Sequence, residues 1–180
     1  MHQKVVPVID QSLNFQLKIV AFEDLVAWRK TLRAERKRLV VTNGCFDLLH
    51  VGHITYLEAA RNQGDALLVG VNSDVAVRAL KGPKRPLNNE QDRAAILAAL
   101  HCVDAVCIFS DLRATGFLSV AEPDIYVKGG DYTLETLDQA ERSAVESGGG
   151  RIAIIPFVAG RSTTSLVEKI SALSLPSLDC

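Results

Sequence analysis

Residues 43–53 read N-G-C-F-D-L-L-H-V-G-H, and this stretch decides both the fold and the chemistry of the chain. An apolar run ends just before it at Val41, a short polar turn follows, and a helical pattern begins beside His50 and His53. This succession predicts a buried strand, a turn of the size of a phosphate group and a helix N-terminus, where backbone N–H groups and the helix dipole favour an anion. Two imidazoles can donate hydrogen bonds to the same anion. The stretch therefore predicts a site for a nucleoside triphosphate.

Outward from this stretch, strand-like and helix-like segments alternate along the whole chain. The predicted strands cover residues 37–43, 66–71, 104–109, 124–128 and 151–157. The predicted helices cover residues 22–36, 53–64, 90–100, 113–121, 134–147 and about 164–173, together with a short helix that Ser73 or Asp74 can cap. Strands that alternate with helices form parallel sheets. The expected fold class is therefore α/β, a Rossmann-like, doubly wound sheet of five parallel strands with helices on both faces.

The same pattern predicts one domain with two short flanking segments. The domain covers residues 22–173, an N-terminal extension covers 1–21, and a C-terminal tail covers 174–180. A length of 180 residues is enough for one domain with a sizeable hydrophobic core.

Composition excludes several classes of function. The chain is 48% hydrophobic and 23% charged, and its net charge of -1 gives no basic excess for binding nucleic acid or a membrane surface. The N-terminus lacks the apolar core of a signal peptide, and no apolar run is long enough to span a bilayer. We therefore expect a cytoplasmic protein whose four cysteines are reduced and whose partners include neither nucleic acid nor membrane.

Polar and glycine residues gather just after four of the predicted strands. They form the segments N-G-C-F-D at 43–47, N-S-D at 72–74, K-G-G-D-Y at 128–132 and G-R-S-T-T at 160–164. Ligands of parallel α/β sheets bind beyond the carboxyl ends of the strands, at the point where the strand order reverses. The four segments are therefore expected to surround one site.

Each residue type in the first turn suits the binding of phosphate. Gly44 lets the backbone approach a ligand, the amides of Cys45 and Phe46 can point at phosphate oxygens, and Asp47 can hold a divalent cation or a substrate hydroxyl. The P-loop pattern and the dinucleotide fingerprint G-x-G-x-x-G are both absent. A zinc site made by Cys45, His50 and His53 is an alternative, but no fourth ligand is evident nearby.

The quoted stretch resembles the signature of the H-x-G-H nucleotidylyltransferase superfamily, in its cytidylyltransferase-like branch. Further segments are similar to the bacterial heptose 1-phosphate adenylyltransferases: V-N-S-D at 71–74, L-K-G-P-K-R-P at 80–86, D-R-A-A-I-L at 92–97, V-K-G-G-D-Y at 127–132 and R-S-T-T at 161–164. The similarity covers about residues 22–172. Such enzymes occur alone or joined to a ribokinase-like half, which has no counterpart here, so the kinase step is not expected of this chain.

The resemblance implies roles for residues at matching positions. His50, His53 and Lys81 are expected to be catalytic, by neutralising charge on the phosphates. The nucleotide is expected to contact Asn43, Gly44, Cys45, Phe46, His50, Gly52, His53, Lys128, Gly130, Arg161, Ser162, Thr163 and Thr164. The second substrate is expected to contact Asp47, Asn72, Asp74, Lys81, Arg93, Lys128 and Asp131. For Asp74 and Arg93, a helix cap and a surface ion pair are the alternatives, and for Ser162 to Thr164 the alternative is simple N-capping.

The implied activity is transfer of AMP from ATP, with Mg²⁺ carried by the triphosphate, to a sugar 1-phosphate with release of pyrophosphate. A heptose 1-phosphate acceptor would give ADP-heptose for lipopolysaccharide or a related glycan. A CTP-dependent enzyme acting on glycerol 3-phosphate or a similar alcohol phosphate is the first alternative, and a non-catalytic nucleotide-binding module is the second. The resemblance also suggests a homodimer, to which the apolar stretch 98–106 contributes unless it is only core helix and strand.

Overall fold

The computed structural model of the chain describes residues 14–130, 132–133, 135–156 and 163–173. Its strands are β1 (Leu39–Gly44), β2 (Ala66–Asn72), β3 (Ala105–Phe109), β4 (Ile125–Gly129) and β5 (Arg151–Ile155). Its α-helices are α1 (Leu25–Ala34), α2 (Val51–Arg61), α3 (Asp74–Lys81), α4 (Glu90–Ala98), α5 (Thr115–Ala121), α6 (Gln139–Ser147) and α7 (Thr163–Ser171). Two short 3₁₀ turns, η2 (Phe15–Lys18) and η3 (Phe22–Asp24), precede α1.

The five strands form one parallel sheet in the order β3-β2-β1-β4-β5. This arrangement confirms the predicted Rossmann-like fold class. The chain moves from β1 outward to β3 and then returns to the other side of β1 with β4, so the order reverses between β1 and β4. The loops after β1 and β4 are therefore the ones expected to face a ligand.

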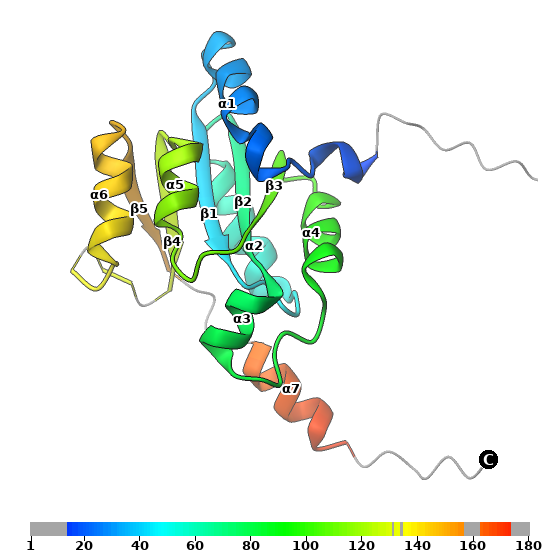
Figure 1. Ribbon diagram of the computed structural model, residues 1–180. Helices are drawn as coiled ribbons and strands as arrows, with labels where there is room; N and C mark the ends of the chain where they lie inside the picture. The colour runs from blue at the N-terminus through cyan, green and yellow to red at the C-terminus, as the bar shows by residue number, and fades with distance from the viewer. Residues whose placement is uncertain (1–13, 131, 134, 157–162, 174–180) are drawn as a thin grey trace, which may run out of the picture.

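Helices cover both faces of the sheet because successive strand residues point to opposite sides. Leu39 and Val41 of β1 pack in a cluster with side chains of α1, α5 and α6. Val40, between them, packs in the second cluster with side chains of α2 and α4. Helices α3 and α7 instead lie at the carboxyl end of the sheet, below it in Figure 1. Each face of the sheet is thus covered by an apolar layer, while polar residues follow the strands at the carboxyl edge.

Two predicted helices begin well after the residue that their sequence pattern suggested, and the helix expected over 113–121 begins slightly late, at Thr115. The helix expected over 22–36 starts with the 3₁₀ turn η3, and its α-helical part is α1. The helix expected over 134–147 begins only at Gln139, because the Asp138 carboxylate accepts hydrogen bonds from the N–H groups of Ala140 and Glu141 and acts as the N-cap.

The described part of the predicted N-terminal extension lies against the domain. The Lys18 ammonium donates to the carbonyls of Leu100 and Val103, at 3.1 and 2.8 Å, and Ile19 pairs with Val106 of β3. Within the stretch 98–106, Ala98, Val103, Ala105 and Val106 are fully buried in this chain. These residues belong to the core of the chain, and a contribution of the stretch to a homodimer stays a prediction.

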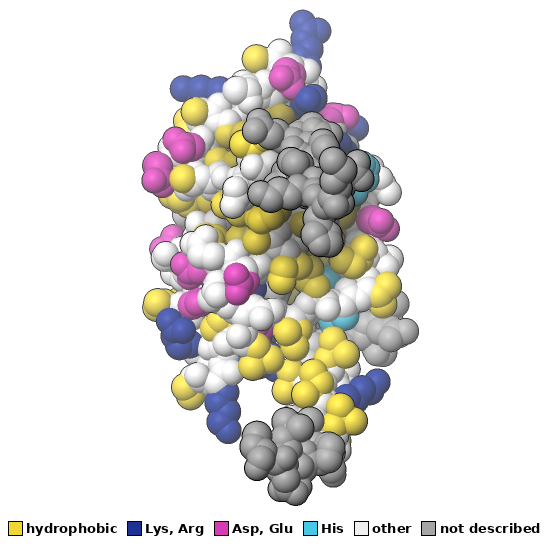
Figure 2. All heavy atoms as spheres, turned by 90° about the vertical axis from the view of Figure 1, so that its right-hand side faces the viewer, with side chains coloured by type: hydrophobic (Ala, Val, Ile, Leu, Met, Phe, Trp, Pro, Cys, Tyr) yellow, Lys and Arg dark blue, Asp and Glu magenta, His cyan; other side chains and the backbone are white. Residues whose placement is uncertain are grey.

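Apolar side chains also reach the surface near η2 and α4. Figure 2 shows hydrophobic side chains over much of the face that carries these elements, with charged side chains toward its margins. Large exposed apolar residues include Leu17, Leu87 and Ile96. More than half of a typical folded surface is apolar, so these residues alone do not define an interface. Among the described helices, none has the length and apolarity that crossing a bilayer requires.

Candidate active site at the carboxyl edge of the sheet

A cavity of about 1010 Å³ opens at the carboxyl edge, beside the point where the strand order reverses. This volume is at the upper end of the range for small-molecule sites and is enough for two substrates. Eleven of the predicted site residues line it: Asn43, Gly44, Cys45, Phe46, Asp47, His53, Asn72, Lys81, Lys128, Thr163 and Thr164. The lining also includes Tyr56, Val77, Leu80, Arg85, Leu112, Arg113, Gly129, Tyr132, Thr136, Asp138 and Glu141.

The turn after β1 holds the two histidines at the start of α2. His50 is the N-cap residue and His53 occupies the third helical position. Their rings stack with centroids 3.9 Å apart, and the Phe46 ring meets His53 edge-on at 5.6 Å. Phe46 itself has a left-handed backbone, with φ of 46°, which is uncommon for an aromatic residue and found often at functional turns. A side chain at Gly44 would push this ring, since a Cβ there would lie 3.1 Å from Phe46 Cε2.

The hydrogen bonding of His53 determines which ring nitrogen can donate into the cavity. The backbone N–H of His50 donates to His53 Nδ1 at 3.3 Å, so Nδ1 is an acceptor and carries no proton. Burial, and to a lesser extent the neighbouring His50, lowers the pKa of His53 from 6.5 to about 4. The ring is therefore neutral at pH 7 with its proton on Nε2. His53 thus offers one N–H donor, while His50 is not among the residues that line the cavity.

We expect His53 to stay neutral through the physiological range. Nitrogen-15 NMR of the imidazole should find the Nε2–H tautomer at pH 7 and protonation only near pH 4, against about 6.5 for the urea-unfolded chain. Because the folded pKa lies below the unfolded pKa, the unfolded chain binds this proton first as the pH falls. Folding stability should therefore decline between about pH 6.5 and pH 4 through this group. A His53 titration near pH 6.5 in the folded protein would contradict the assignment.

Asp47 ties the basic loop of residues 82–89 to the first turn. Its carboxylate is 8% exposed and pairs with the Arg85 guanidinium at 2.7 Å. The N–H groups of Leu87 and Asn88 donate to the other carboxylate oxygen, at 2.7 and 3.1 Å. Both oxygens thus already have partners within the protein. In this structure Asp47 organises the loop beside Lys81, and the predicted contact of Asp47 with a substrate stays a prediction.

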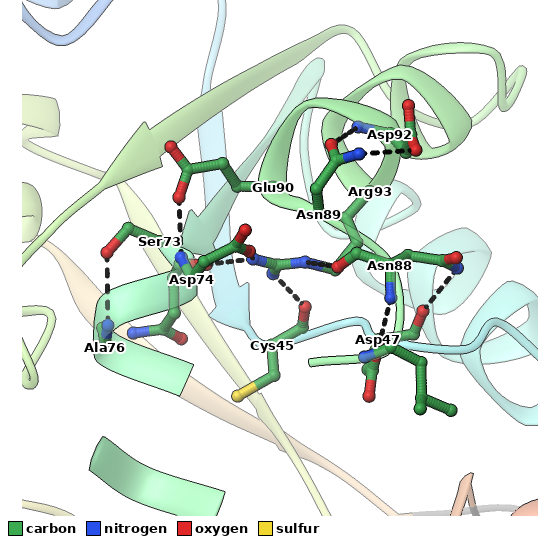
Figure 3. Close-up of polar contacts among 12 residues, drawn as sticks. Cys45, Asp47, Ser73, Asp74, Ala76, Asn88, Asn89, Glu90, Asp92 and Arg93 are labelled. Atoms are coloured by element: carbon green, nitrogen blue, oxygen red, sulfur yellow. Dashed lines mark hydrogen bonds and ion pairs between the residues drawn. The ribbon is translucent and has the colours of Figure 1, made fainter. Parts of the chain in front are cut away.

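Arg93 of α4 joins three loops that border the site. Its guanidinium is fully buried and donates to the carbonyls of Cys45, Asn72 and Asn88, at 2.5, 2.8 and 3.0 Å. It also pairs with the Asp74 carboxylate at 2.8 Å (Figure 3). Neither Arg93 nor Asp74 lines the cavity. Of the alternatives considered for this pair, an ion pair is present, but it is buried at Arg93 and not on the surface.

The start of α3 is fixed by its neighbours in the same network. The Ser73 hydroxyl accepts from the N–H of Ala76, which confirms Ser73 as the capping residue, and Glu90 accepts from the N–H of Asp74 at 2.6 Å (Figure 3). Asn72 is 4% exposed and lines the cavity at the end of β2. α3 thereby presents Lys81, an exposed residue of its last turn, at the mouth of the cavity.

A second polar network lies on the β4 side and contains two residues that the sequence did not single out. Lys128, only 9% exposed, donates to Asn43 Oδ1 at 3.0 Å and pairs with Glu141 at 3.2 Å. The Tyr126 hydroxyl lies 2.7 Å from Asn43 Oδ1 and 2.9 Å from Glu141 Oε2. Burial lowers the pKa of Lys128, and Glu141 opposes that change. Glu141 was missed because D-Q-A-E at 138–141 is the pattern of an ordinary N-terminal capping box.

The last wall of the cavity is the N-terminus of α7. The Thr163 hydroxyl donates to the carbonyl of Leu48 at 3.1 Å, which fastens the helix to the turn after β1. Thr163 and Thr164 both line the cavity. Asp131, Arg161 and Ser162 lie outside the described residues, and Gly52 and Gly130 are described but do not line the cavity.

No described residues form a protein-built metal site. The part of the chain that the structure describes has no group of three or more His, Cys, Asp or Glu side chains placed to hold a metal ion. The zinc alternative of Cys45, His50 and His53 is therefore wrong. Burial raises the pKa of the Cys45 thiol, which also disfavours a thiolate ligand.

Comparison with known families gives a match that coincides with this site. A family model described as Cytidylyltransferase-like matches residues 41–164. The matched span begins in β1 and ends in the first turn of α7, so it contains every described side chain that lines the cavity.

Curated relatives share about half of their aligned residues with this chain. The Bifunctional protein HldE of Trichlorobacter lovleyi is 52% identical over 138 residues, which are 77% of this chain and 28% of that protein. The protein of the same name from Syntrophotalea carbinolica is 51% identical over 162 residues, 88% of this chain and 32% of that protein. The chain thus spans about a third of the length of these relatives.

Two solved structures have a similar fold. The lipopolysaccharide core biosynthesis protein of Thermoplasma volcanium is 30% identical with a TM-score of 0.56, and the match covers 68% of this chain and 97% of that one. Pantoate-beta-alanine ligase of Francisella tularensis, complexed with beta-gamma ATP and beta-alanine, has a TM-score of 0.54 at 14% identity, over 86% of this chain and 78% of that one. The second likeness is one of fold alone.

Proposed function

Because the chain belongs to the cytidylyltransferase-like family, we propose that it is an adenylyltransferase that moves AMP from ATP to a sugar 1-phosphate and releases pyrophosphate. The segments V-K-G-G-D-Y and R-S-T-T, which resemble the heptose 1-phosphate adenylyltransferases, favour a heptose acceptor. The similarity to a lipopolysaccharide core biosynthesis protein supports a sugar phosphate over an alcohol phosphate.

One observation carries the proposal: four separate elements bring phosphate-binding groups to one cavity. His53 comes from α2, Lys81 from α3, Lys128 from β4 and Thr163 from the start of α7. An imidazole N–H, an ammonium and the backbone N–H groups of a helix N-terminus all stabilise phosphate anions. Their arrangement around about 1010 Å³ suits a triphosphate together with a second, phosphorylated substrate.

The chemistry needs no nucleophile from the protein. An oxygen of the sugar phosphate attacks the α-phosphorus of ATP in line, the bond from that phosphorus to the bridging oxygen of the β-phosphate breaks, and pyrophosphate leaves with the electron pair. The attacking phosphate is already an anion at neutral pH. Catalysis then consists of positioning the two substrates and stabilising the charge that moves onto the leaving oxygens.

The described side chains divide this work between them. His53 donates from Nε2 to a phosphate oxygen, and it needs no change of protonation because the ring is neutral at pH 7. Lys81 of α3 and Lys128 of β4 neutralise charge within the cavity. Mg²⁺ would arrive with the triphosphate and offset part of its charge.

A screen for pyrophosphate release tests the proposal. ATP and CTP are each combined with heptose 1-phosphate, other sugar 1-phosphates and glycerol 3-phosphate, with Mg²⁺ present. We expect turnover with ATP and a sugar 1-phosphate, heptose 1-phosphate being the best acceptor. Turnover only with CTP and glycerol 3-phosphate would replace the proposal with the cytidylyltransferase alternative. ATP binding by calorimetry without turnover for any pair would indicate a nucleotide-binding module.

The predicted homodimer is also a proposal. Size-exclusion chromatography with light scattering of the full chain tests it, and a mass of 19.5 kDa would contradict it.

A further inference from the structure

Glu141 is a buried carboxylate that reaches from α6 to the wall of the cavity. It is 6% exposed, although it lies in the first turn of a helix whose neighbouring residues are mostly exposed. One oxygen accepts from the N–H of Ala114, at the start of α5, at 3.0 Å. The other oxygen lies 3.2 Å from Lys128 Nζ and 2.9 Å from the Tyr126 hydroxyl.

We infer that Glu141 is a positioning residue for the phosphate-binding wall: it holds the ammonium of Lys128 directly, and the amide of Asn43 through Tyr126. This inference rests on the proposed function, because it assigns Lys128 and Asn43 to the binding of substrate phosphates. Glu141 is not expected to touch the reacting atoms.

The need for such a residue follows from the burial of Lys128. An ammonium that is removed from water tends to lose its proton unless an anion lies close by. Among the described residues, the titratable groups that face Lys128 are Glu141 of α6, its N-cap residue Asp138, and the phenols of Tyr126 and Tyr132. Asp138 is already paired with Arg113, so Glu141 is the carboxylate that keeps Lys128 charged.

Tyr126 extends the same control to Asn43 on β1. A phenol hydroxyl has one hydrogen, yet Tyr126 lies within hydrogen-bond distance of two acceptors, Asn43 Oδ1 and Glu141 Oε2. Lys128 donates to both of these acceptors as well. If a phosphate oxygen draws the ammonium away, the Tyr126 hydrogen can take its place on either acceptor. When Lys128 turns to a ligand, the Tyr126 hydroxyl therefore still supplies a donor to one of the two acceptors.

A purely structural role for Glu141, as the partner of the Ala114 N–H, is the competing explanation. Both roles would lower stability if the residue were replaced, so stability does not separate them. The pKa of Lys128 does separate them, because only the positioning role requires a carboxylate next to the ammonium.

The experiment compares Glu141→Gln with Glu146→Gln in the full chain. Glu146 lies on the same helix, is exposed and pairs with Arg142, so its replacement makes the same chemical change away from the cavity. The pKa of Lys128 is measured by NMR of ¹³Cε-lysine, with its signal assigned from Lys128→Arg, and kcat/KM for pyrophosphate release is measured from pH 6 to pH 10. The first readout does not depend on turnover.

In Glu141→Gln we expect the pKa of Lys128 to fall by about one unit or more, the scale of losing an opposite charge at this distance. The alkaline limb of the kcat/KM profile should move to lower pH by a similar amount, because Lys128 loses its proton earlier. At pH 7.5 kcat/KM should fall about tenfold or more, as expected for a misplaced positioning group. Glu146→Gln should change none of these.

An unchanged Lys128 pKa and pH profile in a folded Glu141→Gln protein would overturn the inference. If that variant does not fold, Glu141→Asp keeps the charge but withdraws it by one methylene, and a smaller fall in the Lys128 pKa is expected; no fall would again overturn the inference. A wild-type protein without turnover for any substrate pair would reject the proposed function, while the lysine titration would still decide the role of Glu141.

Discussion

His53→Ala is expected to lower turnover at least about a hundredfold, the lower end for losing one transition-state hydrogen-bond donor. The physical reason is the single N–H that His53 directs from Nε2, since its Nδ1 accepts from the His50 backbone. Loss of the ring also removes its contacts with Phe46 and His50, so a modest fall in melting temperature is expected without unfolding. Pyrophosphate release with saturating ATP and acceptor measures the effect.

Two further substitutions test which nitrogen of His53 matters. Gln places an amide N–H near the position of Nε2, whereas Asn places an acceptor near Nδ1 and has no group that reaches Nε2. We expect His53→Asn to be impaired as severely as His53→Ala, and His53→Gln to retain more activity than either. His101→Ala, at an exposed position on the surface, is the matched control and should be neutral. Near-normal turnover of His53→Asn would remove His53 from the catalytic assignment.

Arg93→Met is expected to cause the largest loss of stability, about 3 kcal/mol or more, in the range seen when one partner of a buried ion pair is removed. Methionine preserves the length and apolar volume of the side chain but has no N–H. The carbonyls of Cys45, Asn72 and Asn88 would each lose a donor, and Asp74 would lose its counter-ion. The partial exposure of Asp74, 22%, places the expectation at the low end of the range.

Urea unfolding followed through the single tryptophan, Trp28, measures this loss. Arg142→Met is the matched control, because Arg142 is more exposed and makes an i,i+4 pair with Glu146; it should change stability by less than about 0.5 kcal/mol. A change below about 1 kcal/mol for Arg93→Met would show that water or loop rearrangement replaces the lost hydrogen bonds. Activity should also fall in Arg93→Met, because the three loops it joins border the cavity.

Local sequence patterns predicted the sheet well because each pattern depends on neighbours in the chain. The apolar runs that end at Val41 and at Val71 are buried strands, and the polar segments after the strands meet at one edge, as parallel strands require. The boundary of α6 was missed for an equally local reason. Asp138 and Leu134 both fit a helical pattern, and only the hydrogen bonds of the Asp138 carboxylate show that the helix starts after it.

The buried charges could not be predicted in the same way. Asp47 was expected to hold a divalent cation or a substrate hydroxyl, and the family resemblance implied a substrate contact for Arg93. In the structure Asp47 pairs with Arg85, 38 positions along the chain, and Arg93 donates to Cys45, 48 positions away. Tyr126 likewise reaches Asn43 only because β4 pairs with β1, and Glu141 reaches Lys128 only because folding brings α6 to β4.

The sequence by itself determined the strand–turn–helix around His50 and His53, the parallel order of elements and the edge at which ligands bind, because backbone propensity and apolar periodicity are properties of short segments. Only the tertiary structure decided which polar side chains face the cavity and which hold its walls together. The residues around a charged side chain in the sequence look the same whether that side chain faces the ligand or holds a wall of the cavity together. Its role depends on whether folding places a partner within hydrogen-bond distance, and for Asp47, Arg93 and Glu141 the partners come from other elements.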